Sequence, residues 1–344
     1  MLKIAAIILI FLGVGRVSAA SFDCTKAETP FEKTICSTPD LSVLDERLSV
    51  AYRTALGGLS DGAKKEMVEG QRVWLDFARH ECSPFAELPT LAYDEGGSHC
   101  LIQSLRRRIS VFENNRMLGG YRFYNFDDYS YAPDHSSPMW ATVATRTRNS
   151  TRIDGEGEIS KNFNIFISQY EDRHFRPRNQ ATALDRGKEA EQLEGMSSSV
   201  NLHPIDIFQK RHLMLQKTDW YYGHGAVHGQ YFISYIHYLL DEPRELTAND
   251  VFSGKDWEDI LANLVKIEVK KYMKAIDYDC CLDLDDADKI KDITSDTGRW
   301  KFSDAGLGIQ FNPYEIGPYS EGAPLIFVPW FELRDNLPNG SSWR

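Results

Sequence analysis

Four of the chain's six cysteines, Cys24, Cys36, Cys82 and Cys100, lie in its first third, and they constrain the fold there more than any other feature. Four cysteines can form two disulfides in three ways, and we favour the combination of Cys24–Cys36 with Cys82–Cys100. A helix from Thr29 to Cys36 rises about 12 Å. The five extended residues before it reach up to about 17 Å, so Cys24 can lie back along the helix to Cys36. Closing the loop between Cys82 and Cys100 stabilises a fold by about 3 kcal/mol in the chain-entropy model.

The first twenty residues indicate export, which permits such disulfides. Met1-Leu2-Lys3 is a short positive start, and the uncharged run from Ile4 to Gly15 is too short to span a bilayer, which needs about 20 residues. The small residues of Val17-Ser18-Ala19-Ala20 suit cleavage, so residues 1–20 are predicted to be a signal peptide. A retained N-terminal anchor is the alternative. No later stretch is apolar and long enough to cross a membrane, so we expect a periplasmic or secreted protein with stable disulfides.

Residues 21–116 have the patterns of helices. Thr29-Pro30-Phe31-Glu32 is a helix start, with a capping threonine, a proline at the first position and a glutamate that reaches back. Apolar side chains then recur at spacings of three and four, and Ser60-Asp61-Gly62 is expected to end that helix. Two further helices are expected at about 63–81 and 99–114, with the Cys82–Cys100 bridge closing the loop between them. Three amphipathic helices can bury one another.

Three segments of this region resemble the N-terminal domain of LprI-type lysozyme inhibitors: FDCTKAETPFEKTICSTPDLSVLDERLSVAYRTAL, QRVWLDFARHEC and HCLIQSLRRRISVF. The resemblance covers about residues 22–112, with the four cysteines and the TPxExxIC, LDxxLxxAY and QRxWL patterns in order. It agrees with a small all-α, disulfide-stapled domain over residues 21–116. The segment between Cys82 and Cys100 departs from the pattern. LprI itself is a lipoprotein, whereas this chain is expected to be released.

The chain changes character near residue 117, where aromatic and strand-like patterns begin. Gly119-Gly120 marks a junction into an extended segment, and the polar residues 171–200 are predicted to be a long loop or an exposed helix. Gln230–Leu240 is apolar on both faces, which predicts a buried central strand. Further elements are expected as a helical turn from Thr247, a helix at 256–275, a half-buried strand at 307–311 and a strand at 325–328. Together these predict an α+β domain over residues 117–344 with a mainly antiparallel sheet.

A second resemblance is carried by YYGHGAVHGQYFISYIHYLL, RELTANDVFSGKDWEDIL and GLGIQFNPYEIGPYSEGAPLIFVPWFEL. These segments look like the C-terminal domain shared by RsiV, a lysozyme-sensing anti-sigma factor, and the peptidoglycan deacetylase PdaC. The resemblance covers about residues 119–337. It implies a binding module without the deacetylase chemistry, and the likeness to RsiV implies lysozyme binding. It also implies structural roles for the motif residues Gly225, His228, Asn312, Tyr314, Glu315 and Tyr319.

Two stretches invite a metal-binding interpretation that we do not favour. His224 and His228 are four residues apart, a zinc spacing on a helix, but three glycines in seven residues disfavour a helix there. Asp283 and Asp285 offer oxygens to calcium, but Asp288 stands where an EF-hand needs glycine and no glutamate stands at the twelfth position. We therefore expect no metal and no other cofactor.

The acidic stretch from Asp277 to Asp296 is either a solvated loop or a contact surface for a basic partner. In the second case, acidic side chains would speed association with a cationic protein such as lysozyme. The candidate partner contacts are Asp283, Asp285, Asp286 and Asp288. The adjacent Cys280 and Cys281 either form a vicinal disulfide or stay unpaired, and the sequence does not decide between these states.

Composition and the lack of catalytic motifs narrow the function. A hydrophobic content of 42% excludes general disorder, and a net charge of −11 disfavours a nucleic-acid binder. Glu315 and Glu321 could form a glycosidase pair, but the prolines and glycines around them mark turns. There is no GxSxG, HExxH or phosphate-binding glycine loop.

The sequence thus predicts an exported, non-enzymatic protein that binds and inhibits a lysozyme-like muramidase. Inhibition would need no catalytic group, because a loop that fills a saccharide cleft and a complementary surface would suffice. The alternatives are a sensing module that binds peptidoglycan or another envelope component, and an immunity protein against a muramidase effector.

Overall fold

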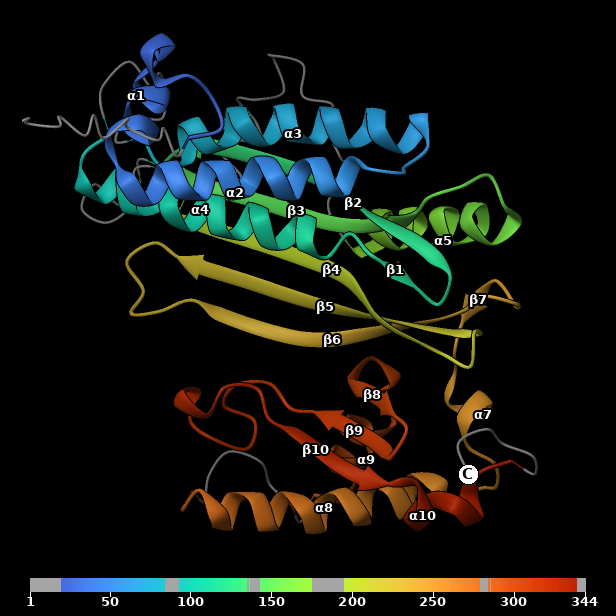
Figure 1. Cartoon of the computed structure of the whole chain (residues 1–344). Coiled ribbons are helices and arrows are strands. Elements are labelled where there is room, and N and C mark those ends of the chain that lie inside the picture. The colour runs from blue at the N-terminus through green and yellow to red at the C-terminus, as the bar shows by residue number, and fades with distance from the viewer. Residues whose placement is uncertain are drawn as a thin grey trace, which may run out of the picture.

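The computed structural model describes residues 20–83, 93–134, 136, 143–174, 195–278, 284 and 286–338. A layer of N-terminal helices, a seven-stranded sheet and a C-terminal unit around a three-stranded sheet follow one another (Figure 1). The predicted fold class is confirmed, because a helical region with two disulfides precedes an α+β region whose sheet is mainly antiparallel. The expected signal peptide lies outside the described residues except for Ala20. No described helix is long and apolar enough to cross a membrane.

The helical layer contains α1 (Pro30–Ser37), α2 (Pro39–Leu56), α3 (Asp61–Glu81) and α4 (Glu95–Glu113), after the short 3-10 turn η1 (Cys24–Lys26). The predicted capping box opens α1: the Glu32 N–H donates to Thr29 Oγ1 at 3.2 Å, and the Glu32 carboxylate accepts from the Thr29 N–H at 2.9 Å. Ser60 does not end a helix. It caps α3, whose first turn contains Asp61 and Gly62, and α2 has already ended at Leu56.

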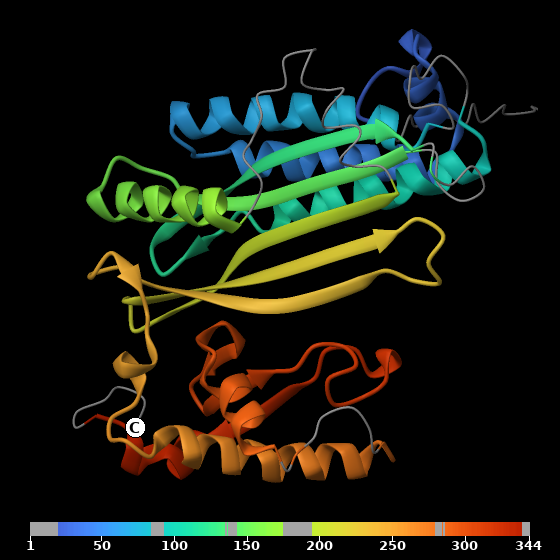
Figure 2. The same cartoon turned by 180° about the vertical axis from the view of Figure 1, so that it is seen from behind.

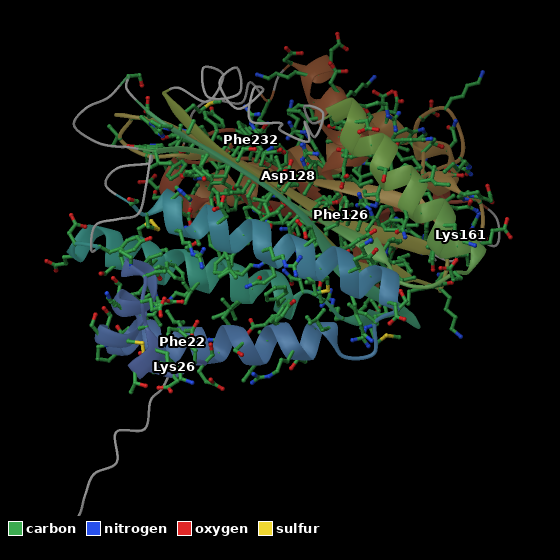
Figure 3. The ribbon with its side chains drawn as sticks, turned by 90° about the horizontal axis from the view of Figure 1, so that it is seen from above. Phe22, Lys26, Phe126, Asp128, Lys161 and Phe232 are labelled. Atoms are coloured by element: carbon green, nitrogen blue, oxygen red, sulfur yellow. A yellow bond between two sulfur atoms is a disulfide. The ribbon has the colours of Figure 1, made fainter. Side chains whose placement is uncertain are left out.

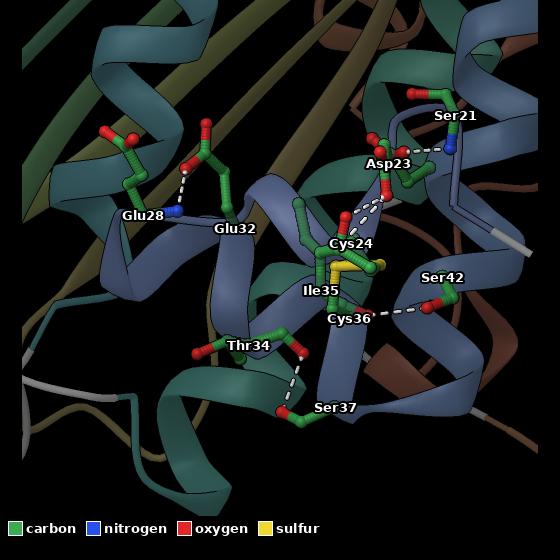
Figure 4. The surroundings of a disulfide bond; sticks show 12 residues. Ser21, Asp23, Cys24, Glu28, Glu32, Thr34, Ile35, Cys36, Ser37 and Ser42 are labelled. Atoms are coloured by element: carbon green, nitrogen blue, oxygen red, sulfur yellow. Dashed lines mark hydrogen bonds between the residues drawn. A yellow bond between two sulfur atoms is a disulfide. The ribbon is translucent and has the colours of Figure 1, made fainter. Parts of the chain in front are cut away.

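Two disulfides staple this layer, and they join the two cysteine pairs favoured from the sequence. Cys24 and Cys36 tie η1 to α1 with their Cα atoms 5.7 Å apart (Figure 4). Cys82 and Cys100 tie the end of α3 to α4 with a Cα separation of 5.4 Å. Beside the first bridge, Ser42 Oγ donates to the Ile35 carbonyl at 2.7 Å and fixes the corner between α1 and α2.

Removal of the α1 cap should cost measurable stability. Thr29→Ala is expected to lower the free energy of unfolding by about 1 kcal/mol, because the Glu32 N–H then loses its acceptor. Thr54 is exposed inside α2, where alanine is the better helix former, so Thr54→Ala should be neutral or slightly stabilising. Urea unfolding followed by circular dichroism measures both variants. An equal loss in both would mean that the cap is not the cause.

The large sheet consists of seven strands in sequence order. They are β1 (Met117–Leu118), β2 (Tyr121–Pro133), β3 (Val143–Ile153), β4 (Met196–Phe208), β5 (His212–Gly223), β6 (Gln230–Leu239) and β7 (Arg244–Glu245). Gly119 and Gly120 have φ values of 57° and 90°, which other residues rarely adopt, and they turn β1 into β2. Among the strands of this sheet that the structure describes, only β3 and β4 pair in parallel. A parallel pair needs a long crossover, and α5 (Glu158–His174) lies in this one.

The two faces of the sheet are covered by different helices. The helical layer lies on one face of β2 and β3, and α5 lies on the other, as the view from behind shows (Figure 2). A buried ion pair holds α5 to β3, with Arg152 donating to both oxygens of Glu171 at 3.0 and 2.8 Å. Seen from above, Lys161 of α5 is far from Phe22 and Lys26 at the start of the helical layer (Figure 3).

The expectation of a loop or an exposed helix over residues 171–200 is partly wrong. Residues 171–174 end α5, residues 175–194 lie outside the described residues, and β4 begins at Met196. The serines at positions 197–199 belong to that strand. Their polarity does not indicate a loop, because Ser197 is buried and its hydroxyl accepts a hydrogen bond from the Thr145 N–H of β3.

The helical layer and the sheet share a core across residue 117. Tyr124 of β2 is buried among the apolar side chains of the helices, and its hydroxyl donates to Glu66 of α3 at 2.8 Å. Arg108 of α4 forms a fully buried ion pair with Asp127 of β2. The helices before residue 117 and the strands after it therefore pack against each other in one interface.

The C-terminal unit packs a long helix against a small antiparallel sheet of order β10-β9-β8. Its elements are α7 (Ala248–Val251), α8 (Trp257–Ala275), α9 (Ala287–Ser295), η2 (Thr297–Arg299), β8 (Trp300–Ser303), β9 (Gly306–Gln310), η3 (Tyr319–Glu321), β10 (Leu325–Pro329), α10 (Trp330–Leu333) and η4 (Arg334–Asn336). Trp300, which is fully buried, lies in its core. Strand β9 is buried on both faces, not on one as predicted, because the side chains of Leu325 and Phe327 lie over Gly308 and Gly306.

The expectation that Gln230–Leu240 is a central strand is also wrong. In the described structure β7 pairs only with Tyr238 and Leu239, so most of β6 has a neighbour in the sheet on one side only. The C-terminal unit lies against this side of β6: the Asn312 side chain accepts from the Ile233 N–H of the strand edge at 2.8 Å, and the His237 side chain donates to the Thr297 carbonyl at 3.1 Å. The apolar pattern predicts burial correctly for the second half of β6, from Tyr235 to Leu239, but not for its first half, where Phe232 is exposed.

Candidate partner-binding surface

The turn between β5 and β6 projects an apolar side chain into solvent. Gly225 adopts a φ of 91°, which favours glycine, and the turn is not helical. Val227 at its tip is 100% exposed. Val227 buries none of its apolar surface within the chain, and burying that surface against another molecule would be favourable. This position therefore suits contact with a partner.

The loop of the C-terminal unit over residues 312–319 lies beside this turn, and hydrogen bonds inside that unit hold it in place. Glu315 accepts from both terminal nitrogens of Arg299, at 2.8 and 3.0 Å, and from the Asn312 N–H at 2.7 Å. Burial alone would lower the pKa of Arg299, but the hydrogen bonds and negative charge of Glu315 raise it, so the guanidinium stays charged. Because Asn312 and Glu315 are both held inward, Tyr314 between them is turned outward with a φ of 71°. A tyrosine in the left-handed region is unusual and is often found at functional sites.

Aromatic rings join the turn to the loop. The His228 ring stacks on Tyr319 with centroids 4.1 Å apart, and His228 Nδ1 donates to the Gly229 carbonyl at 2.9 Å. His228 Nε2 can then accept from the Tyr314 hydroxyl, 3.2 Å away. We call Val227, His228, Tyr314 and Tyr319 the hairpin–loop surface. It combines a fully exposed valine with an exposed tyrosine, and tyrosine is enriched among the residues that dominate the binding energy of protein interfaces.

The second histidine of the turn faces away from this surface. His224 Nδ1 donates to Asp134, and His224 Nε2 accepts from Ser197 Oγ at 2.9 Å. Burial would raise the pKa of Asp134, but hydrogen bonds from Ser136, His224 and the Gly195 N–H hold it at about 2. The network therefore ties the ends of β2, β4 and β5 together around a charged carboxylate.

The order serine, histidine, aspartate is that of a hydrolase triad, but the geometry favours a structural role. The His224 side chain is 1% exposed and Ser197 is 8% exposed. Ser197 Oγ also accepts from the Thr145 N–H at 3.1 Å. His224 and His228 bind separate partners, so they do not form the zinc pair considered above. Among the described residues no three histidine, cysteine or acidic side chains are placed to hold a metal ion.

The remaining predicted contacts are only partly described. Asp283, Asp285 and the cysteines at 280 and 281 lie outside the described residues. Asp286 caps α9 by accepting from the Lys289 N–H at 3.0 Å, and Asp288 is exposed in the first turn of α9. Sequence reasoning found the motif loop but not Val227 or Arg299. An exposed valine in a turn and an arginine sixteen residues from its partner leave no signal in the pattern.

The chain consists of a disulfide-stapled helical layer packed on an α+β body. Comparison with known proteins finds a family match in each part. Residues 23–111 match the family described as lysozyme inhibitor LprI. Residues 249–331 match the family described as protein of unknown function, DUF3298. Both resemblances stated from the sequence are thereby confirmed.

Two solved structures are similar to the chain at low identity. A DUF3298 family member from Bacteroides fragilis is 14% identical with a TM-score of 0.42, and the match covers 65% of this chain and 96% of that one. A DUF3298 family protein from Pseudomonas aeruginosa is 13% identical with a TM-score of 0.45 and the same coverage. Neither likeness carries an argument about function. No curated protein matches the chain.

Proposed function

We propose that this protein is exported and inhibits a lysozyme-like muramidase by occupying it, without catalysing a reaction. The observation that carries the proposal is the match of residues 23–111 to the lysozyme inhibitor family. The proposal includes the domain organisation expected from the sequence: a signal peptide at 1–20, a helical domain at 21–116 and an α+β domain at 117–344. The two disulfides are consistent with a periplasmic or secreted location.

We place the contact at the hairpin–loop surface, which lies outside the matched residues 23–111, so this placement rests on the geometry of that surface and not on the family match. An inhibitor of a saccharide-cleaving enzyme needs a projecting, rigid element that fills a cleft, and Val227 and Tyr314 project from a turn and a loop that brace each other. The net charge of −11 attracts a cationic enzyme and raises the association rate at low salt. The anchoring by Arg299 and Asn312 reduces the entropy lost on binding, because the loop is already ordered.

The test is the lysis of cell-wall suspensions by several muramidases, followed by turbidity, with and without the full chain. Wild type should inhibit at least one of them, and more strongly at low than at high salt. Val227→Asp and Tyr314→Ala should each weaken inhibition by about tenfold or more, since each removes a central contact. An immunity protein against a muramidase effector would differ in inhibiting a narrower set of enzymes.

The matched control is Val43→Asp, because Val43 is also an exposed valine, 59% exposed, but lies on α2. It should leave inhibition unchanged. Loss of inhibition in Val43→Asp with none in Val227→Asp would move the contact to the helical layer. Full turbidity loss with every muramidase in the presence of wild type would refute the proposed function itself.

A further inference from the structure

The faces of β4 and β5 differ sharply in chemistry. Leu213 and Leu215 of β5 pack with α5, whereas Met214 packs with the C-terminal unit, so even-numbered side chains of β5 point away from α5. The register then sets which β4 side chains share that even face: Ser199 pairs with Trp220, and Asn201 pairs with Thr218.

On this face, between the helical layer and the C-terminal unit, lies a strip without a charged side chain. We define the polar strip as Ser199, Asn201, Gln216, Thr218, Trp220 and Tyr222. Trp220 is 36% exposed and the other five are half-buried. The opposite face of the same β5 segment carries Lys217 and Asp219, which form an ion pair at 2.7 Å. The charged side chains of this β5 segment thus lie on the opposite face, and the strip carries no charge in a chain whose residues are 26% charged.

The side chains of the strip are held in place from both ends. Asn201 accepts from Asn149 Nδ2 at 2.7 Å, and Asn149 accepts from the Tyr129 hydroxyl at 2.8 Å beneath the helical layer. At the other end the Trp220 and Tyr222 rings stack with centroids 6.3 Å apart and planes 20° apart. Next to Asn201 lies a small pocket of about 40 Å³, whose lining includes Asn114, Asn115, Asn125, Asn149, Asn201 and His203.

We propose that the polar strip binds an uncharged glycan chain, a function separate from the inhibition proposed above. A sugar ring has an apolar face that packs on an exposed indole, and hydroxyl groups that both donate and accept. The strip offers that pair of features: Trp220 as a platform, and amide and hydroxyl side chains that donate and accept along two strands. The asparagine-lined pocket suits a small polar substituent of such a chain, such as an acetamido group. A cationic or anionic ligand would find no countercharge in the strip.

The test titrates the full-length protein with a soluble oligosaccharide of β-1,4-linked N-acetylglucosamine and follows tryptophan fluorescence and calorimetry. Binding should be saturable and should not change between about 0.05 and 0.5 M salt, since no charges pair. Trp220→Ala should lower the association constant by about tenfold or more and remove the fluorescence change. Thr218→Lys, which puts a charge in the strip, should weaken binding without altering Trp220.

The matched control is Tyr221→Ala. Tyr221 is the next residue of β5, is 41% exposed and lies on the opposite face, stacked on Phe232, which is labelled in Figure 3. It should bind like wild type. No saturable binding by wild type would overturn the proposal, and so would equal losses in Trp220→Ala and Tyr221→Ala. Loss of muramidase inhibition in Trp220→Ala, with no glycan binding by wild type, would assign the strip to a protein partner instead.

Discussion

Asp127→Ala should destabilise the protein by about 3–5 kcal/mol, because it leaves the Arg108 guanidinium buried without its carboxylate. Both side chains of the pair are fully buried. Arg108 also donates to Gln71 at 2.9 Å and to the Tyr129 hydroxyl at 2.9 Å, and it lies 4.3 Å above the Phe112 ring. These partners are neutral and cannot replace the negative charge. The loss should appear in urea unfolding as a lower midpoint at an unchanged slope.

Two further variants make this result interpretable. Arg108→Met combined with Asp127→Ala removes both charges and should recover part of the loss, since the cost arises from the unpaired charge. Glu113→Ala breaks the exposed Arg47–Glu113 pair, whose side chains are 61% and 52% exposed, and should cost less than about 1 kcal/mol. Because the pair joins α4 to β2, helical and sheet signals should unfold together in the single variant. A loss below about 1 kcal/mol, or a helical layer that unfolds separately, would contradict this account of the interface.

The elements that were predicted correctly from the sequence are those whose signals are local. The capping box places Thr29 and Glu32 three residues apart, so its two hydrogen bonds follow from the sequence alone. The helix expected at 256–275 is found as α8 (Trp257–Ala275), because its apolar face repeats within each turn. The Cys24–Cys36 pairing could be predicted for the same reason, since the two cysteines are twelve positions apart in the sequence.

The features that were missed depend on partners distant in sequence. His224 bonds to Asp134 across ninety residues, and Asn312 caps the edge of β6 at Ile233 across seventy-nine. No spacing rule connects such positions, because the pairing arises only when the sheet and the C-terminal unit have packed. The polar strip is a similar case. The β4 part of the strip has a sequence typical of solvent-exposed chain, and the β5 part has that of an ordinary strand. Only the register of the two strands shows that these residues form one surface.

Acidification from pH 6.5 towards pH 4 should remove about 3 kcal/mol of stability through a buried histidine pair. His212 Nε2 donates to His237 Nδ1 at 3.0 Å, and His237 Nε2 donates to the Thr297 carbonyl at 3.1 Å, so both rings are neutral. The Phe302 ring lies edge-on to both. Burial lowers the pKa of His237 from 6.5 to about 4. Burial, and then His237 and Arg211, lower the pKa of His212 in the same direction.

The sign follows from the lowered pKa. Above pH 6.5 both the folded and unfolded chains carry neutral histidine, and the stability is complete. As the pH falls towards 4, the unfolded chain takes up protons that the folded chain cannot, and stability is lost. Asp134 has its pKa lowered from 3.8 to about 2, so its stabilising contribution also begins to fall below about pH 5, and the histidine variants are needed to separate the two effects.

Urea unfolding at about pH 7.5 and about pH 4.5 measures the effect, and two variants locate it. His237→Gln keeps an amide donor within reach of Thr297 but does not titrate, so it should reduce the pH dependence by about half or more. His99→Gln changes an exposed histidine of α4 and should leave it unchanged. If His237→Gln kept the full pH dependence, the loss would have to come from other groups. If His237→Gln flattened it, acid would weaken first the contact between β6 and η2, where His237 joins the large sheet to the C-terminal unit that carries Tyr314.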